Sequence, residues 1–115
     1  MNYVHDAGVL VTIFVSEDDR YHGERLYRAI VNLAHDMHVS GATIIRGFEG
    51  FGASTNIHSQ QNIRMSEDLP IMINVIDKRE RLEPFINEVK VMLDDAKAHG
   101  FISISPTEMI RPHSS

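Results

Sequence analysis

Three glycines at the predicted end of a strand form the segment whose residue types point most directly to chemistry. It reads Arg46-Gly47-Phe48-Glu49-Gly50-Phe51-Gly52. Glycine tolerates positive φ and lets a bound group approach backbone N–H donors, and an adjacent arginine offers planar donors to phosphate or carboxylate. The spacing G-x-x-G-x-G, with no helix directly after it, matches neither a Rossmann fingerprint nor a P-loop. The cluster indicates either ligand contact or a bulged, flexible loop entry.

A long polar stretch, residues 49–68, follows this cluster. Loops of about twenty residues are uncommon inside compact domains unless they are functional or disordered. The functional interpretation is an arm that binds a partner and orders when a ligand or partner is present, and the alternative is a flexible insertion. The side chains that would contact the partner are Ser54, Asn56, His58, Gln60 and Arg64.

Two further groups of residues invite a metal or acid–base hypothesis. The run Glu17-Asp18-Asp19-Arg20 follows the first predicted strand, where carboxylates can bind Mg²⁺ or exchange protons, or form a solvated turn. Asp19 and Arg20 are kept as candidate site residues. His35 and His38 share a helix face but need a third ligand, such as His58, to hold a metal. Solvated surface histidines explain them better than a metal site does, so we predict no metal site. No spacing predicts a nucleophile–base pair, so we predict no enzyme.

The composition limits the class of protein. The chain has 115 residues, of which 43% are apolar, which predicts one domain over 1–115. It has no cysteine, and so no disulfide or thiolate metal site. The first residues do not resemble a secretion signal, and the longest apolar stretch, 9–15, is too short to span a bilayer. A cytoplasmic location is expected. The net charge of −5 argues against nucleic-acid binding.

Hydrophobic periodicity predicts four strands and two helices. The strands are expected at 9–15, 42–48, 69–76 and 101–110, the last an edge or bent strand because of Pro106. The helices are expected at 23–39 and at 77–99, with Asp77 as the cap of the second and Gly100 just beyond its end. Pro84 would kink this helix or delay its start to about Glu83. The order predicts an α+β fold of the ferredoxin-like βαββαβ type, an antiparallel four-stranded sheet with two helices on one face.

The strand sequences also predict assembly. Two helices cover only one face of such a sheet, yet the other face would present Leu10, Phe14, Met72 and Ile76. A soluble monomer rarely exposes a patch of this kind. We therefore expect other copies of the chain to cover it in a homo-oligomer.

Several of these segments resemble a known family. They are Glu17-x-Asp19-Arg20, the run from Leu26 to Val31, the run from Ser40 to Gly52, and Asp68-Leu69-Pro70-Ile71. Together they resemble the uncharacterised "domain of unknown function" family numbered 190, over nearly the whole chain. That family is similar to the PII signalling proteins. The resemblance implies a homotrimer that binds an adenine nucleotide in clefts between subunits. It also implies a T-loop, here about 49–68, that reaches a protein target such as a transporter or a metabolic enzyme.

Site residues follow from the resemblance by position. Those implied to lie at the nucleotide are Thr43, Arg46, Gly47, Phe48, Gly50, Gly52 and Arg111, beside the candidates Asp19 and Arg20. PII proteins grip phosphates with a glycine- and lysine-containing loop before the last strand, and here only Lys97 could serve. AMP or ADP is therefore as plausible a ligand as ATP. The loop also lacks a tyrosine for PII-style modification.

The expected function is that of a nucleotide-responsive regulator. One alternative is a metal-binding trimer that resembles the copper-tolerance proteins and uses His35, His38 or His58. Another is a small enzyme on the same fold, because fold alone does not determine function.

Overall fold

The computed structural model describes residues 2–47 and 69–113. The strands are β1 (Tyr3–Ser16), β2 (Arg20–Tyr21), β3 (Glu24–Arg25), β4 (Gly41–Arg46), β5 (Pro70–Asp77) and β6 (Phe101–Pro112), and the helices are α1 (Leu26–Asp36) and α3 (Arg79–Ala96). The predictions made for Phe48, Gly50, Gly52 and the loop residues Ser54, Asn56, His58, Gln60 and Arg64 lie outside the described residues.

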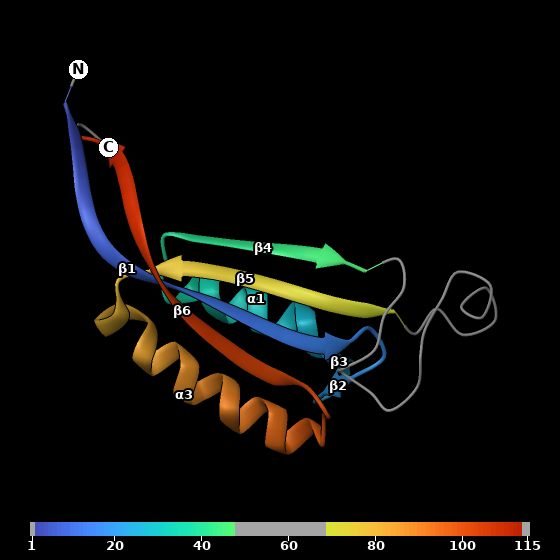
Figure 1. Cartoon of the computed structure of the whole chain (residues 1–115). Helices are drawn as coiled ribbons and strands as arrows, with labels where there is room; N and C mark the ends of the chain where they lie inside the picture. The colour runs from blue at the N-terminus through green and yellow to red at the C-terminus, as the bar shows by residue number, and fades with distance from the viewer. Residues whose placement is uncertain (1, 48–68, 114–115) are drawn as a thin grey trace.

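The four long strands form one antiparallel sheet in the order β4-β5-β1-β6, and α1 and α3 lie on one side of it (Figure 1). This arrangement confirms the predicted ferredoxin-like fold. The core lies between sheet and helices, where alternate residues of β1 and β5 are fully buried, as the two-residue period of a strand requires. These are Val11, Ile13, Val15, Ile73 and Val75.

A two-stranded ribbon extends the sheet beyond the helices (Figure 1). β1 begins at Tyr3, six residues before the predicted start, and pairs with β6 as far as Pro112. The last strand therefore ends two residues later than the predicted 110. Pro106 lies within β6, opposite Val9, and β6 is an edge strand of the sheet as predicted.

A short hairpin replaces the predicted start of the first helix. β2 and β3 pair across His22 and Gly23, which have φ of 50° and 87°. Positive φ at both central residues is typical of the type I′ turn, which matches the twist of a two-residue hairpin. The helix begins at Leu26, because the hairpin uses Gly23 as a turn residue. The helix also ends earlier than predicted, at Asp36, and His38 has the left-handed φ of 59°.

The second helix corrects three predictions. It begins at Arg79 after Lys78, so Asp77 is the last residue of β5 and not the cap. Pro84 lies inside the helix and does not delay its start. The helix ends at Ala96 and not at 99, so Lys97, in the left-handed conformation, takes the place beyond the helix end that was predicted for Gly100.

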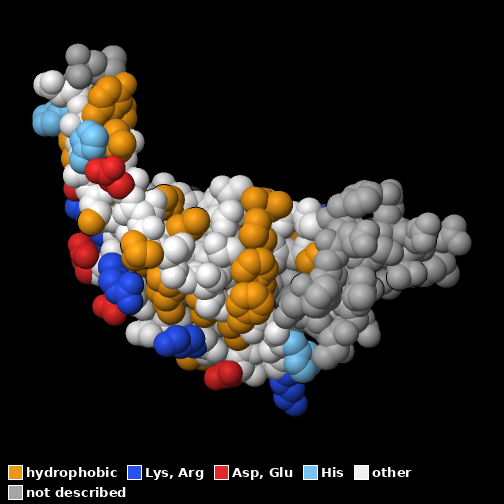
Figure 2. Space-filling view, in the orientation of Figure 1, with side chains coloured by type: hydrophobic (Ala, Val, Ile, Leu, Met, Phe, Trp, Pro, Cys, Tyr) orange, Lys and Arg blue, Asp and Glu red, His pale blue; other side chains and the backbone are white. Residues whose placement is uncertain are grey.

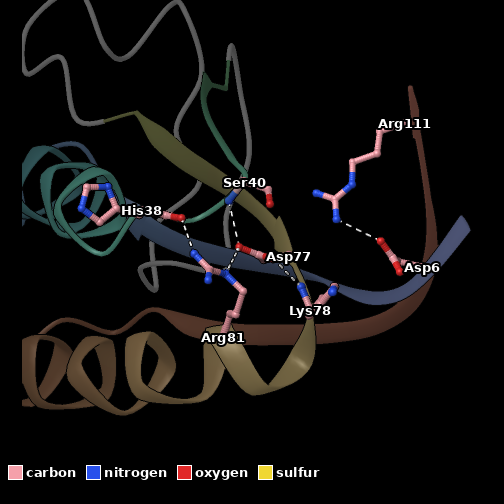
Figure 3. Close-up of polar contacts among 7 residues, drawn as sticks. All are labelled: Asp6, His38, Ser40, Asp77, Lys78, Arg81 and Arg111. Atoms are coloured by element: carbon pink, nitrogen blue, oxygen red, sulfur yellow. Dashed lines mark hydrogen bonds and ion pairs between the residues drawn. The ribbon is translucent and has the colours of Figure 1, made fainter. Parts of the chain in front are cut away.

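Asp77 instead joins the two halves of the fold (Figure 3). Its carboxylate is 2% exposed and accepts hydrogen bonds from the Ser40 N–H at 2.9 Å, the Lys78 N–H at 2.7 Å and the Arg81 Nε at 3.1 Å. Arg81 Nη2 also donates to the His38 carbonyl at 2.7 Å. The buried Asp77 carboxylate thus joins three parts of the fold: the end of β5, the start of α3 and the connection from α1 to β4.

Gly100 is needed for close approach between strands. A Cβ atom at this position would overlap the carbonyl oxygen of Phe14. We expect Gly100→Ala to lower the free energy of unfolding by about 2 kcal/mol, because backbone must shift to make room. Urea denaturation would measure it. Gly41→Ala is the control, since the nearest atom to its Cβ would be 3.5 Å away. Equal, small effects for both variants would show that the strands tolerate the shift.

The face of the sheet opposite the helices carries residues in cross-strand rows. One apolar row runs Ile45, Met72, Phe14 and Phe101, and a polar row beside it runs Thr43, Asn74, Thr12 and Ser103. Phe14 and Phe101 stack with ring centroids 4.6 Å apart, and Thr12 donates to Asn74 at 2.9 Å. Figure 2 shows apolar side chains in bands on this side of the molecule. We call it the open face. Its partly exposed apolar residues agree with the pattern expected from the sequence.

Candidate functional site

The carboxyl ends of β1 and β4 lie at the same edge of the sheet. Both strands are antiparallel to β5, which lies between them, so they run parallel to each other. Glu17 follows β1 and Arg46 ends β4, and Arg46 Nη2 donates to Glu17 Oε2 at 2.6 Å. The arginine side chain is 51% exposed, whereas the glutamate side chain is 9% exposed. This edge of the sheet therefore carries an ion pair between a half-exposed arginine and a buried carboxylate.

Glu17 also contacts the chain just before β5. Its N–H donates to the Leu69 carbonyl at 2.8 Å, and its own carbonyl accepts from Arg25 Nη1 at 2.8 Å. Its Oε1 is buried and receives no hydrogen bond from the part of the chain that the structure describes. Glu17 thus connects the end of β1 with the end of β4 and with Leu69, which precedes β5. Its Oε1 remains able to accept a hydrogen bond.

Gly47 lies in close contact with Pro70 at this edge of the sheet. Its N–H donates to the Pro70 carbonyl at 2.7 Å, and a Cβ atom would lie 2.7 Å from Pro70 Cγ. The glycine allows β4 and β5 to approach closely where they leave the sheet. Its N–H is engaged by the Pro70 carbonyl, and the ligand contact expected at Gly47 stays a prediction.

The acidic turn is ordered by its own hydrogen bonds. Asp19 Oδ2 accepts from the Ser16 N–H at 2.9 Å, and the Asp19 carbonyl accepts from the Leu26 N–H at 2.8 Å. Asp18 lies 3.4 Å from Arg25 Nη1. Arg20 is exposed in β2. Asp19 therefore shapes the turn that places Glu17, and Arg20 lies beside it on the hairpin.

Two predicted residues lie away from Arg46. Thr43 is exposed on β4 opposite Asn74, on the open face, whereas Arg46 alternates to the other face. Arg111 lies in the ribbon, pairs with Val4 and donates to Asp6 at 2.9 Å (Figure 3). Arg111 pairs with Val4 and Arg46 lies level with Val15, and the eleven steps between them correspond to about 36 Å along β1. Within one chain, Arg111 and Arg46 cannot contact the same small molecule.

Metal ligands do not gather in the described ranges. Residues 2–47 and 69–113 contain no group of three His, Asp or Glu side chains placed to hold a metal ion. His35 is 90% exposed beside Asp36, and His38 lies beyond the end of α1. His58 lies outside the described residues, so the three-histidine hypothesis is tested only for the first two. Among the described helices, none has the length and apolar character needed to cross a membrane.

Glu17 was not predicted as a site residue, although the acidic run that contains it was noted. The signal was present in the predicted topology. In a βαβ unit the two strands run parallel, so an acid after the first strand and an arginine at the end of the second meet at one edge. The composition of the run alone could not distinguish Glu17 from its neighbours.

Comparison with known sequences places the chain among uncharacterised relatives. The model of the DUF190 family, described as "Uncharacterized ACR, COG1993", matches residues 8–109. A UPF0166 protein of Aquifex aeolicus is 29% identical over 101 residues, covering 88% of this chain and 91% of the relative. A UPF0166 protein of Methanocaldococcus jannaschii is 26% identical over 96 residues, covering 84% and 85%.

Two solved structures that resemble this chain are PII-like proteins. CPII from Thiomonas intermedia K12, a nitrogen regulatory PII-like protein bound to ADP, AMP and bicarbonate, has a TM-score of 0.71 at 16% identity, with 95% of this chain and 93% of that chain covered. A putative PII-like signalling protein from Thermus thermophilus has a TM-score of 0.65 at 15% identity, with 95% and 93% covered. Because the family model matches residues 8–109, the chain belongs to the DUF190 family, and its similarity to CPII shows that it has a PII-like fold.

Proposed function

We propose that this protein is a cytoplasmic, homotrimeric PII-like regulator rather than an enzyme. It binds an adenine nucleotide between subunits and controls a partner protein through residues 49–68. The observation that carries the proposal is the half-exposed Arg46 side chain, paired with Glu17 at the end of β4. A guanidinium binds phosphate through paired N–H donors, and here it sits where β4 leaves the sheet. A neighbour of the same fold was solved with ADP and AMP.

The placement of Arg111 supports a site between subunits. Because about 36 Å of β1 separates it from Arg46, only an Arg111 from another copy could face the same ligand. The open face supplies a reason for copies to associate, since Phe101 and Ile45 remain 48% and 42% exposed there. We propose that copies associate through this face and that the nucleotide binds in a cleft between neighbouring copies, at the strand ends near Arg46.

Calorimetric titration with AMP, ADP, ATP and cyclic dinucleotides tests the proposal. We expect saturable binding, counted per subunit, and Arg46→Gln should weaken the preferred nucleotide about tenfold because one charge-assisted phosphate contact is lost. Lys90→Gln is the control, since this exposed residue on α3 carries the same charge away from β4. If none of these nucleotides binds the folded wild-type protein, the proposed ligand class is wrong. Equal losses in both variants would indicate a general effect of charge.

A further inference from the structure

We infer that Glu17 is the residue that selects the ligand and couples its binding to the sheet edge, by competing with the ligand's phosphate for Arg46. The inference rests on the proposed function, because it concerns the same arginine. Glu17 Oε2 lies 2.6 Å from Arg46 Nη2. Bidentate phosphate binding uses adjacent guanidinium nitrogens, so carboxylate and phosphate require overlapping donors, and two anions at one guanidinium repel each other.

The burial of Glu17 determines which ligand can displace it. The residue is 7% exposed, and Oε1 receives no hydrogen bond from any described residue. A buried carboxylate that loses its arginine is left with an uncompensated charge, which is costly unless another donor replaces the guanidinium. A ligand that brings only an anion must leave this charge unpaired. A ligand that brings an anion and a hydroxyl or amine donor satisfies both partners, and a nucleotide has both groups.

The backbone contacts of Glu17 connect this exchange to the surrounding chain. Its N–H and carbonyl bind Leu69 and Arg25, whereas its side chain holds Arg46 at the end of β4. When a ligand takes Arg46, the side-chain link between the ends of β1 and β4 is lost and the backbone links remain. Ligand binding therefore weakens the attachment of the carboxyl end of β4 to β1.

Removal of the carboxylate charge tests the inference. In wild-type protein, ADP should bind more tightly than pyrophosphate, which lacks the hydroxyl and amine donors. Glu17→Gln keeps the shape and an acceptor oxygen but removes the anion that pyrophosphate cannot satisfy. Pyrophosphate affinity should therefore rise about tenfold, whereas ADP affinity should change less because its donor loses a charged acceptor. Asp18→Asn removes the same charge one residue away, from a carboxylate that lies near Arg25 and is half exposed, and should change the affinity less than about twofold. Calorimetry of the full chain measures both ratios.

Each outcome is decisive. An unchanged or weaker pyrophosphate affinity in Glu17→Gln, or an equal gain in Asp18→Asn, would overturn the inference. The equal gain would show that the negative charge of the acidic turn acts at a distance, without competition at Arg46. Absence of nucleotide binding in wild type and both variants would instead overturn the proposed function. If Glu17→Gln melts too early to titrate, carbon-detected NMR of the wild type decides. ADP should then shift the Glu17 carboxylate resonance and leave that of Asp18 in place, and an unmoved Glu17 signal would contradict the competition.

Discussion

Asp77→Ala is expected to lower the free energy of unfolding by about 3 kcal/mol, a large share of the stability of a small domain. The substitution leaves the Ser40 and Lys78 N–H groups without their acceptor and removes the anion that holds Arg81. The loss separates the end of β5 from the connection between α1 and β4. Urea denaturation followed by circular dichroism would measure it.

Asp6→Ala is the matched control for this prediction. Asp6 also accepts a hydrogen bond from one arginine, Arg111, at 2.9 Å (Figure 3). This contact lies in the ribbon, and no backbone N–H of residues 2–47 or 69–113 is seen to donate to the Asp6 carboxylate. We expect a cost below about 1 kcal/mol for Asp6→Ala. Similar costs for the two variants would contradict a special role for the junction around Asp77.

The pH dependence of stability gives a second readout for Asp77. Burial alone would raise the pKa of this carboxyl, but the N–H groups of Lys78 and Ser40 and the Arg81 guanidinium outweigh burial and hold the pKa below the ordinary 3.8. A carboxyl with a lowered folded pKa stabilises the fold above its unfolded pKa, and this stabilisation disappears as the pH falls through the folded pKa. The difference between wild type and Asp77→Ala should be constant from about pH 7 to about pH 5 and shrink below about pH 4.

Phe101→Glu is expected to dissociate the proposed trimer. Phe101 is 48% exposed, stacks on Phe14 and belongs to the apolar row of the open face. A charge buried at the centre of an interface costs several kcal/mol for each subunit, enough to shift assembly by orders of magnitude in concentration. Light scattering after size-exclusion chromatography would report the mass.

Val91→Glu is the control for the assembly prediction. Val91 is also 48% exposed, but it lies on α3, away from the open face. It should leave the mass unchanged. If Val91→Glu dissociates the assembly and Phe101→Glu does not, subunits associate through the helices and the proposed intersubunit cleft is misplaced. A monomeric wild-type protein would reject the trimer itself.

The fold was predictable from the sequence wherever one face of a strand or helix is buried, because apolar residues then recur at regular spacing. Val11, Ile13 and Val15 alternate because one face of β1 is covered by helices, and that alternation identifies the strand. His5, Asp6 and Gly8 continue the same strand without such a pattern, because the ribbon extends past the helices and is held by pairing with β6. No local pattern marks residues whose strand character depends on a partner about a hundred positions away.

The candidate site was predictable in part. Arg46 and Gly47 were identified from their types, but the role of Gly47 depends on its distance from Pro70, which no local pattern contains. The hairpin at His22 and Gly23 was missed because polar residues flank it, although a glycine between short strands is a known turn signal. Gly100 was predicted to lie just beyond the end of the second helix, but Lys97 has the left-handed conformation at that point. Gly100 is a glycine for another reason, because its backbone packs against the carbonyl of Phe14 and leaves no room for a side chain.

The pairing of β1 with β6 has a consequence for how the chain folds during synthesis. The paired residues are separated by 87 positions at Phe14 and Phe101 and by 109 at Tyr3 and Pro112. At roughly 5–20 residues per second, β1 leaves the ribosome about 5–20 s before its neighbour exists. During that interval one edge of an apolar strand is available to other nascent chains. Slow translation should therefore favour aggregation, and binding of β1 by a chaperone should favour the native sheet.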